Sequence, residues 1–276
     1  MSDARRGGRG QRGGRRGGDQ PRARSAGDPT RARVVGGVHP VRELLRSEQP
    51  VTELLLSRSG DAEIAELEQL AAARGVPVKG ERDRDELDAV SGDLVHQGVV
   101  ALAPALPSVT VEHLVELAAA ADEPPLLVAL DHVTDPQNLG SIARTADAVG
   151  AHGLILPERR AAGVTPSAEK AAAGAFAHLP VATVANLNRT LAVLGERGVW
   201  SIGLDGDADG LLADHPLASE PCVLVVGAEG AGLARLTRER CDALVRLPMR
   251  GHVGSLNASV AAGVALYELL RARGRR

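Results

Sequence analysis

The sequence predicts an α/β protein whose C-terminal half forms a mostly parallel sheet, and two observations predict it. From Leu126 onwards, short apolar strands alternate with helical segments, which is typical of a sheet covered by helices on both faces. Aromatic residues make up 1% of the chain, so the core must be aliphatic. A length of 276 residues leaves room for about two domains, and we expect a smaller α/β domain before the large one.

The N-terminal residues differ from the rest in composition. Residues 1–33 contain ten arginines and three aspartates, a net charge of +7, so the remainder of the chain carries −10. This stretch is rich in glycine and has no apolar periodicity, which predicts a disordered tail. Arginine on a flexible chain favours non-specific attraction to RNA phosphates, although a solubilising tail without a partner is the alternative.

We expect a small α/β domain over residues 34–106 and a linker over 107–124. Helices are predicted at His39–Arg46 and Asp61–Arg74, and Gly75 ends the second of them. The predicted strands are Glu53–Ser57, Val76–Lys79 and Val99–Ala103. An Ala-rich helix, Val111–Ala121, occupies the linker, which prolines close at both ends.

The second domain, residues 125–276, alternates strand and helix. The predicted strands are Leu126–Leu130, Gly153–Leu156, Val181–Val184, Trp200–Leu204, Cys222–Val226 and Leu244–Leu247. The predicted helices are Asn138–Val149, Pro166–Ala175, Asn186–Arg197 and Ser255–Arg273. Ligands of such sheets bind at the carboxyl ends of the strands. Three polar, glycine-bearing loops begin at such ends, which is the main argument from the sequence for a functional site.

The first loop, Asp131–Ala151, leads into a helix. Asn138 is placed to cap that helix, and Ile142 and Ala146 form its inward face. Arg144 points to nearly the opposite side. A solvated arginine is the common interpretation of such a residue. Against it, a cation near a helix N-terminus is disfavoured without an anionic partner, and an RNA phosphate would provide one.

The second loop, Val225–Thr237, places Glu229 among Gly227, Gly230 and Gly232 directly after a strand. The glycine spacing is neither the dinucleotide-binding fingerprint nor a P-loop, since no Gly-Lys-Ser/Thr follows. A glutamate held among glycines is costly unless something uses it. The loop therefore predicts a site that needs a carboxylate.

The third loop belongs to the block Leu247–Leu270. Ser255 is predicted to cap the last helix, and an amide, Asn257, follows two positions later. An ordinary loop and cap is the alternative interpretation. The apolar residues at helical spacing are expected to form the buried stripe of this helix: Leu256, Val260, Val264 and Tyr267.

Other functions find little support. The histidines have no metal-ligand spacing, and the aspartates from Asp205 onwards meet Pro216 where a calcium loop needs glutamate. We therefore expect no metal. Ser201, Asp205 and His215 lack the elbow motif of a hydrolase. The sequence has no apolar run that could span a bilayer and no signal-peptide pattern, and it contains two cysteines. We expect a cytoplasmic protein without a membrane partner.

Together the three loops carry a resemblance. NLGSIARTADAVGA, VVGAEGAGL and LPMRGHVGSLNASVAAGVALYELL resemble, in order and spacing, the signature motifs of the SpoU (TrmH-type) RNA 2′-O-ribose methyltransferases of the SPOUT superfamily. HQGVVALA, residues 96–103, is similar to part of the ribosomal-protein-like substrate-binding domain of many members. The layout is most similar to that of the bacterial enzymes that methylate a guanosine of 23S rRNA.

The resemblance implies a C-terminal domain tied into a trefoil knot, S-adenosylmethionine as cofactor, and a homodimer that acts on RNA, and the layout implies rRNA as that RNA. By their motif positions, three residues are expected to contact the cofactor: Gly227, Leu247 and Leu256. Five more fall on catalytic and RNA-binding positions of the family: Asn138, Arg144, Glu229, Ser255 and Asn257. Arginine seldom loses its proton, so Arg144 is expected to stabilise charge electrostatically.

Two alternatives stay open at this point. One keeps the chemistry and changes the substrate, to a tRNA ribose or to a different rRNA site methylated by a resistance enzyme. The other is a non-catalytic RNA-binding protein of ribosome assembly that keeps the fold. The presence of Asn138, Arg144, Glu229 and Asn257 argues against the second alternative.

Overall fold

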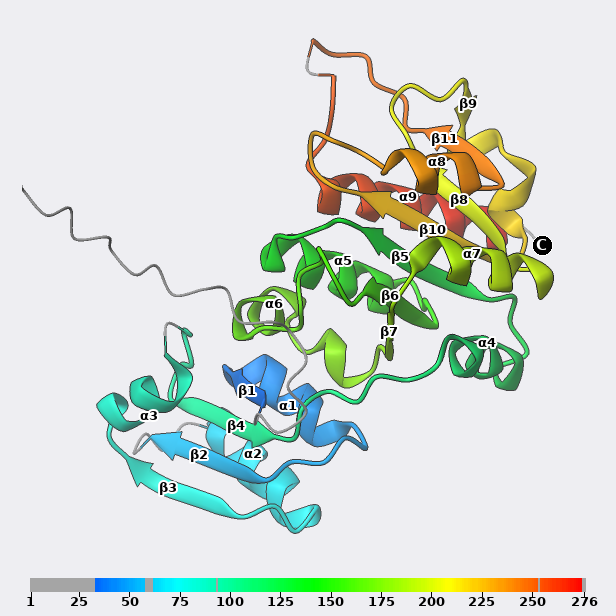
Figure 1. The fold of residues 1–276 in the computed structure, drawn as a ribbon. Coiled ribbons are helices and arrows are strands. Elements are labelled where there is room, and N and C mark those ends of the chain that lie inside the picture. The colour runs from blue at the N-terminus through cyan, green and yellow to red at the C-terminus, as the bar shows by residue number, and fades with distance from the viewer. Residues whose placement is uncertain (1–32, 58–61, 93, 253, 275–276) are drawn as a thin grey trace, which may run out of the picture.

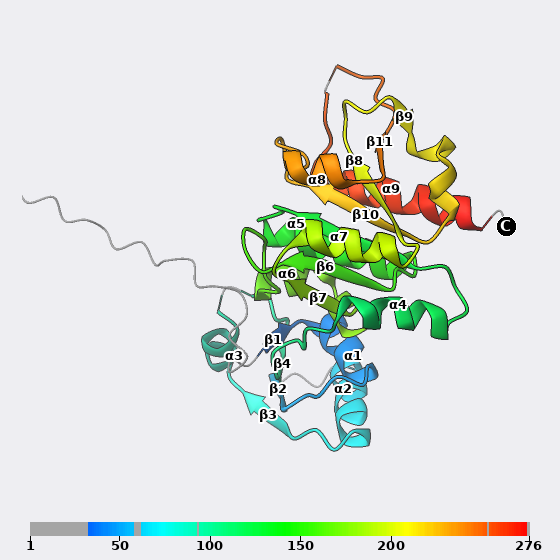
Figure 2. The ribbon, with the colours of Figure 1, turned by 45° about the vertical axis from the view of Figure 1, so that its right-hand side comes forward.

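The computed structural model describes residues 33–57, 62–92, 94–252 and 254–274. The predicted tail up to residue 32 lies outside the described residues. Figures 1 and 2 show two α/β bodies, a smaller N-terminal one below a larger C-terminal one. None of the described helices is both long and apolar enough to cross a bilayer.

The smaller body is a four-stranded mixed sheet in the order β1-β4-β2-β3. Its strands are β1 (Arg33–Gly36), β2 (Glu53–Ser57), β3 (Val78–Arg82) and β4 (Val99–Ala103). Strand β4 is antiparallel to β1 and β2, and β2 is parallel to β3. Helices α1 (Val38–Arg46) and α2 (Ala62–Ala73) pack on one face, and α3 (Arg84–Ser91) contributes Leu87 to the other.

Helix α4 (Val111–Ala120) connects the two bodies and precedes a seven-stranded sheet in the order β7-β6-β5-β10-β8-β11-β9. Its strands are β5 (Leu126–Asp131), β6 (Gly153–Pro157), β7 (Val181–Val184), β8 (Trp200–Leu204), β9 (Gly210–Leu211), β10 (Cys222–Gly227) and β11 (Ala243–Arg246). Every pairing recorded between these strands is parallel. The fold class predicted from the sequence is confirmed, whereas the threading of a knot stays a prediction.

Alternate residues of the central strands face opposite layers, as the pleat requires. Leu126, Val128 and Leu130 of β5 join a core formed with α5 (Pro136–Ala148), α6 (Pro166–Ala172) and α9 (Ala258–Arg273). Leu127 and Ala129 face α4 and α7 (Leu187–Glu196) instead. A short helix, α8 (Arg235–Arg240), completes the α7 side. In Figure 1 the carboxyl ends of β5 and β10 lie at the left, where the three predicted loops begin.

Helices α5 and α6 pack unusually closely because Gly140 lies between them. A Cβ at this position would come within 2.3 Å of the Ala168 carbonyl oxygen and 2.6 Å of the Ala171 Cβ. Glycine is therefore required at position 140 by the approach of a neighbouring helix.

A polar joint holds the two bodies together. Arg33 forms a buried ion pair with Glu169 of α6, and their side chains are 6% and 2% exposed. Burial raises the pKa of the Glu169 carboxyl above its usual range, and the Arg33 guanidinium opposes that shift. Arg33 Nη1 also donates to Gln49 Oε1 at 2.6 Å.

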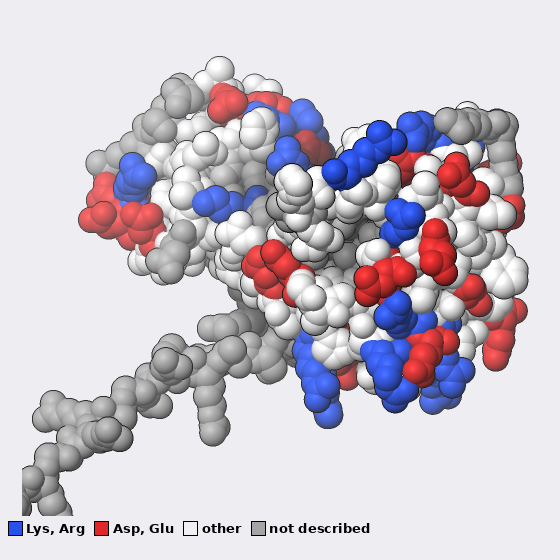
Figure 3. All heavy atoms as spheres, turned by 90° about the horizontal axis from the view of Figure 1, so that it is seen from above, with Lys and Arg blue, Asp and Glu red and all other residues white. Residues whose placement is uncertain are grey.

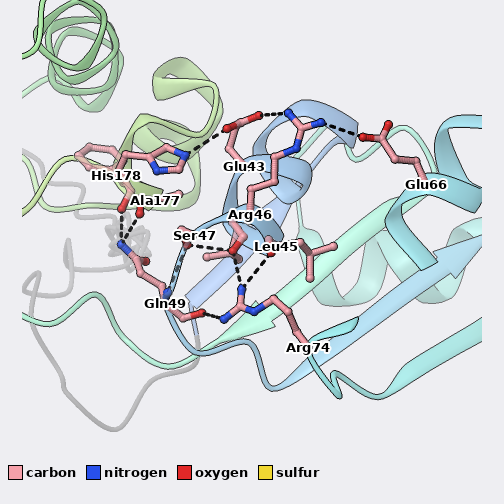
Figure 4. Close-up of polar contacts among 11 residues, drawn as sticks. Glu43, Leu45, Arg46, Ser47, Gln49, Glu66, Arg74, Ala177 and His178 are labelled. Atoms are coloured by element: carbon pink, nitrogen blue, oxygen red, sulfur yellow. Dashed lines mark hydrogen bonds and ion pairs between the residues drawn. The ribbon is translucent and has the colours of Figure 1, made fainter. Parts of the chain in front are cut away.

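Gln49 in turn donates from Nε2 to the carbonyl oxygens of Phe176 and Ala177, at 2.7 and 3.2 Å. Beside it, His178 Nε2 lies 3.1 Å from Glu43 Oε2 of α1 (Figure 4). Arg33, assigned to the tail from composition, thus starts the first strand and belongs to the joint.

Four of the described α-helices and strands escaped the sequence reading: β1, β9, α3 and α8. Helix α3 has a signal that could have revealed it, because Asp83 and Glu86 form a capping box at its start. Two predicted helix starts were wrong. Helix α5 begins at Pro136, where Asp135 accepts from the Gln137 N–H, so Asn138 is not its cap. Helix α9 begins at Ala258 and not at Ser255.

Candidate active site

Three side chains from the three loops meet at the carboxyl ends of β5, β10 and β11. Asn257 donates from Nδ2 to Asn138 Oδ1 at 3.0 Å and to Glu229 Oε2 at 3.1 Å. Asn138 also donates from Nδ2 to Glu229 Oε2 at 3.3 Å. Residues that are 91 and 119 positions apart are thereby joined. We call Asn138, Glu229 and Asn257 the amide–carboxylate cluster.

Asn257 has a fixed orientation because it is also the N-cap of α9. Its Oδ1 accepts from the Ser259 N–H at 2.9 Å, from Ser259 Oγ at 2.6 Å and from the Val260 N–H at 3.3 Å. With the carbonyl oxygen committed to the helix, the amide nitrogen must face Asn138 and Glu229. Asn257 therefore does the capping that the sequence reading gave to Ser255, which is exposed in the loop.

Glu229 stands at the tip of a tight turn. Ala228 and Gly232 exchange two backbone hydrogen bonds, at 3.0 and 2.9 Å, and Gly230 and Gly232 have φ of 76° and 67°. The turn folds back on the end of β10, so that a Cβ at Gly227 would lie 2.2 Å from the Gly232 carbonyl carbon. Glycine is required at 227 by the chain's own backbone, whether or not a cofactor also contacts it.

Asp131 is a residue of this region that the sequence reading missed. It ends β5 and is 2% exposed. Its Oδ2 accepts a hydrogen bond from the Ala234 N–H at 2.7 Å, and its Oδ1 lies 2.6 Å from His132 Nδ1. Asp131 thus fastens the far end of the Glu229 turn to the neighbouring strand. The available signal was a carboxylate that closes an otherwise apolar strand, since a buried carboxylate needs donors.

Arg144 does not join the cluster in the single chain. It is exposed on α5, six residues after Asn138, which turns it about 120° around the helix from Asn138. Among the described residues it has no recorded partner. Because α5 begins at Pro136, Arg144 lies more than two turns inside the helix. The helix dipole, which acts on charges in the first turn, therefore gives no reason to expect an anionic partner for Arg144.

The apolar stripe of α9 that was predicted to be buried is exposed. Val260, Val264 and Tyr267 are 51%, 43% and 55% exposed, and Leu256 and Leu270 are about 40% exposed. The buried side consists of Ala258, Ala262, Ala265, Leu266 and Leu269. These mostly small residues let α9 lie close to α5, where a Cβ at Gly263 would be 3.7 Å from Thr145 Cγ2. We call Val260, Val264, Tyr267 and Leu270 the α9 apolar surface.

Three glycines of the second and third loops have open backbone. A Cβ at Gly230, Gly251 or Gly254 would meet no atom within 4 Å. Leu247 packs half-buried against the core where the third loop begins. Open backbone at the carboxyl ends of a parallel sheet fits a nucleoside cofactor held mainly by main-chain groups. In the described part of the chain, no three His, Cys, Asp or Glu side chains are placed to bind a metal.

Comparison with known proteins agrees with this geometry. Residues 125–267 match the SpoU rRNA methylase family, and residues 34–109 match the RNA 2′-O ribose methyltransferase substrate-binding domain. The chain belongs to the SpoU family. The resemblance seen in the sequence is thereby confirmed, and so is its implication that the chain is an RNA 2′-O-ribose methyltransferase.

Individual relatives cover nearly the whole fold. The 23S rRNA (guanosine-2′-O-)-methyltransferase RlmB of Pseudomonas aeruginosa is 47% identical over 87% of this chain and 96% of its own length. An uncharacterized tRNA/rRNA methyltransferase of Mycobacterium sp. (strain KMS) is 44% identical over 92% of this chain and 81% of its own. The SpoU methyltransferase AviRb of Streptomyces viridochromogenes, solved with AdoMet, superposes with a TM-score of 0.73 at 31% identity, covering 88% and 90% of the two chains.

Proposed function

We propose that this enzyme transfers a methyl group from S-adenosylmethionine to the ribose 2′-hydroxyl of a guanosine in 23S rRNA. The convergence of Asn138, Glu229 and Asn257 from three loops supports the reaction. The similarity to RlmB over nearly its whole length supports the substrate. AviRb and an rRNA methyltransferase of Sinorhizobium meliloti with bound AdoMet support the cofactor. The cytoplasm is the proposed location of the reaction.

The cofactor, when bound, supplies a methyl group on a sulfonium, and this chain's residues align the acceptor. Gly227, Leu247 and Leu256 are proposed to hold the cofactor beside the open loop backbone. A ribose hydroxyl is a weak nucleophile near neutral pH, so the site must help it to lose a proton. Asn138, Ser255 and Asn257 are proposed to fix the ribose and its phosphate through amide and hydroxyl groups. Alignment of this kind lowers a barrier by several kcal/mol, up to about 7–11 in well-oriented reactions.

Arg144 is proposed to stabilise the charge that develops on the ribose oxygen. Its guanidinium is free of recorded partners in the described chain, and it can act as a fixed cation without giving up a proton. Glu229 is bonded to Asn138 and Asn257 rather than to Arg144. Its role in the proposal is therefore to orient these two amides.

We infer that two copies pair through the α9 apolar surface, which supports the expected homodimer. Four large apolar side chains at spacings of four, three and three residues lie along one exposed face, and a contiguous apolar surface of this kind favours association. Arg144 lies beside that surface, because the next residue, Thr145, contacts α9 at Gly263. In the dimer Arg144 lies at the interface, where the partner subunit completes its surroundings.

Arg144→Ala tests the assignment of chemistry. We expect methyl transfer to fall by at least about a hundredfold, while calorimetry with S-adenosylhomocysteine gives the wild-type affinity. Near-normal turnover of the variant would contradict the role of Arg144. The matched control is Arg235→Ala, which removes an exposed arginine paired with Glu239 on α8.

Mapping of ribose methylation tests the substrate. Ribosomal and transfer RNA from cells that lack this enzyme are compared with RNA from complemented cells. A guanosine of 23S rRNA should lose its methyl group and regain it only with the active enzyme. A tRNA nucleotide that behaves in this way would establish the second candidate, which the name of the mycobacterial relative includes.

A further inference from the structure

Most arginines of the described chain have an acidic or backbone partner, and a few beside the active site do not. Arg42, Arg46, Arg82, Arg197, Arg235, Arg238 and Arg271 form recorded ion pairs. Eight others have no recorded side-chain partner among the described residues, and four of these lie on the loop after β6 and on helices α7 and α8: Arg159, Arg160, Arg189 and Arg240. All four are exposed. We call them the arginine row.

Arg159 and Arg160 lie on the loop that follows β6, next to β5 in the sheet. Two backbone hydrogen bonds fix this loop. Glu158 N donates to Val184 O of β7 at 2.9 Å, and Ala162 N donates to Val133 O, in the loop that leads to Asn138, at 2.8 Å. The loop that carries the arginine pair is thus hydrogen-bonded to the loop that leads to Asn138.

Arg160 has a left-handed backbone, with φ of 58°. This conformation is costly for a residue with a long side chain, and such strain persists where the surrounding structure imposes it, often at ligand-binding positions. Glu158 adds one negative charge, so the segment keeps a net charge of +1. The fixed loop presents both guanidinium groups to solvent.

Arg189 and Arg240 continue the row on the neighbouring helices. They face a shared hollow between α7 and α8, together with Asn186, Asn188 and Ala192. Asn188 Oδ1 is buried and has no hydrogen-bond partner in the described structure. Arg189 lies in the first turn of α7, where a cation is disfavoured unless an anion accompanies it. Figure 3 shows Lys and Arg side chains along the lower margin of the larger body, with Asp and Glu side chains among them.

We propose that the arginine row binds successive phosphates of the RNA strand next to the methylated nucleotide. Arginine is suited to phosphate because its planar fork donates two parallel hydrogen bonds. The row therefore sets the register in which the target ribose reaches the amide–carboxylate cluster. This inference rests on the proposed function, because it takes RNA as the ligand.

Direct RNA binding tests the row without methyl transfer. The variants are Arg159→Ala/Arg160→Ala and Arg189→Ala/Arg240→Ala, and the control is Arg197→Ala at the C-terminal end of α7, where Arg197 pairs with Glu112. The probes are purified 23S rRNA and a 20-nucleotide RNA of unrelated sequence, at a series of salt concentrations. Each double variant should bind both RNAs about tenfold or more weakly at low salt. The slope of log K against log salt should fall by about one unit per arginine.

Three outcomes separate the proposals. Double variants that match Arg197→Ala in affinity and salt slope would overturn the arginine row. An unchanged affinity for S-adenosylhomocysteine shows that a weaker variant is still folded at its active site. If the wild type methylates no RNA while the double variants still lose RNA affinity, the proposed function fails and the arginine row stands.

Discussion

Breaking the buried ion pair between the two bodies should destabilise the protein far more than breaking an exposed pair. Glu169→Leu leaves the Arg33 guanidinium, 6% exposed, without a counter-charge, and Arg33→Met does the same to Glu169. Loss of one partner of a buried pair costs about 3–5 kcal/mol. Arg197→Met, which breaks a pair whose side chains are 46% and 42% exposed, should cost at most about 1 kcal/mol.

The double variant Arg33→Met/Glu169→Leu should be much less destabilised than either single variant. It buries no uncompensated charge, and it loses only neutral contacts and the bond from Arg33 to Gln49, worth about 1–3 kcal/mol. The coupling energy of the double-mutant cycle should therefore be several kcal/mol.

Urea unfolding measures these free energies with two probes. The fluorescence of Trp200, the single tryptophan, reports on the larger body, and far-ultraviolet circular dichroism reports on both. Destabilisations that simply add in the double variant would refute the reasoning. So would single variants no less stable than Arg197→Met.

Three further predictions follow from the site and the core. Asn257→Asp keeps the oxygen that caps α9 and places a carboxylate against Glu229, so methyl transfer should fall about a hundredfold while the free energy of unfolding stays nearly unchanged. Asn257→Ala should also lose about 1 kcal/mol of stability. Wild-type activity of both variants would contradict the role of the amide–carboxylate cluster. Val264→Asp should convert the dimer to monomers in sedimentation velocity while Val264→Ala does not, and a dimeric Val264→Asp would exclude this interface. Burial raises the pKa of Cys241 to about 12 from 9.0. The unfolded chain therefore releases this proton first, and the free energy of unfolding should fall by about 1.4 kcal/mol per pH unit above pH 9. An equal pH dependence of the unfolding free energy in wild type and Cys241→Ala would contradict this.

The sequence was sufficient to place the amide–carboxylate cluster because parallel strands bring their carboxyl ends to one edge. Asn138, Glu229 and Asn257 each follow such an end, and the structure joins them. The details of capping were not predictable to the same degree, because Ser255 and Asn257 are both good N-caps. The start of α5 was predictable, because Asp135 is a good N-cap and Pro136 is favoured at the first position of a helix.

The errors share a physical cause, which is that a single sequence does not say what a side chain will face. Val264 and Tyr267 read as core because apolar residues at helical spacing usually point inwards, yet α9 buries three alanines and two leucines of a different face and leaves Val264 and Tyr267 exposed. Arg33 read as tail because the stretch before it is rich in arginine and glycine. Its partner, Glu169, lies 136 residues away.

The central place of β10 has a consequence for synthesis of the chain. Strand β10 lies between β5 and β8, and all six residues of β5 are buried. While the ribosome is still making residues before Cys222, β5 can pair only with β6 and keeps an unpaired apolar edge. Such an edge invites pairing with a second nascent chain. Truncated products that stop short of Cys222 should therefore aggregate, and a chaperone that shields this edge should raise the yield of the complete enzyme.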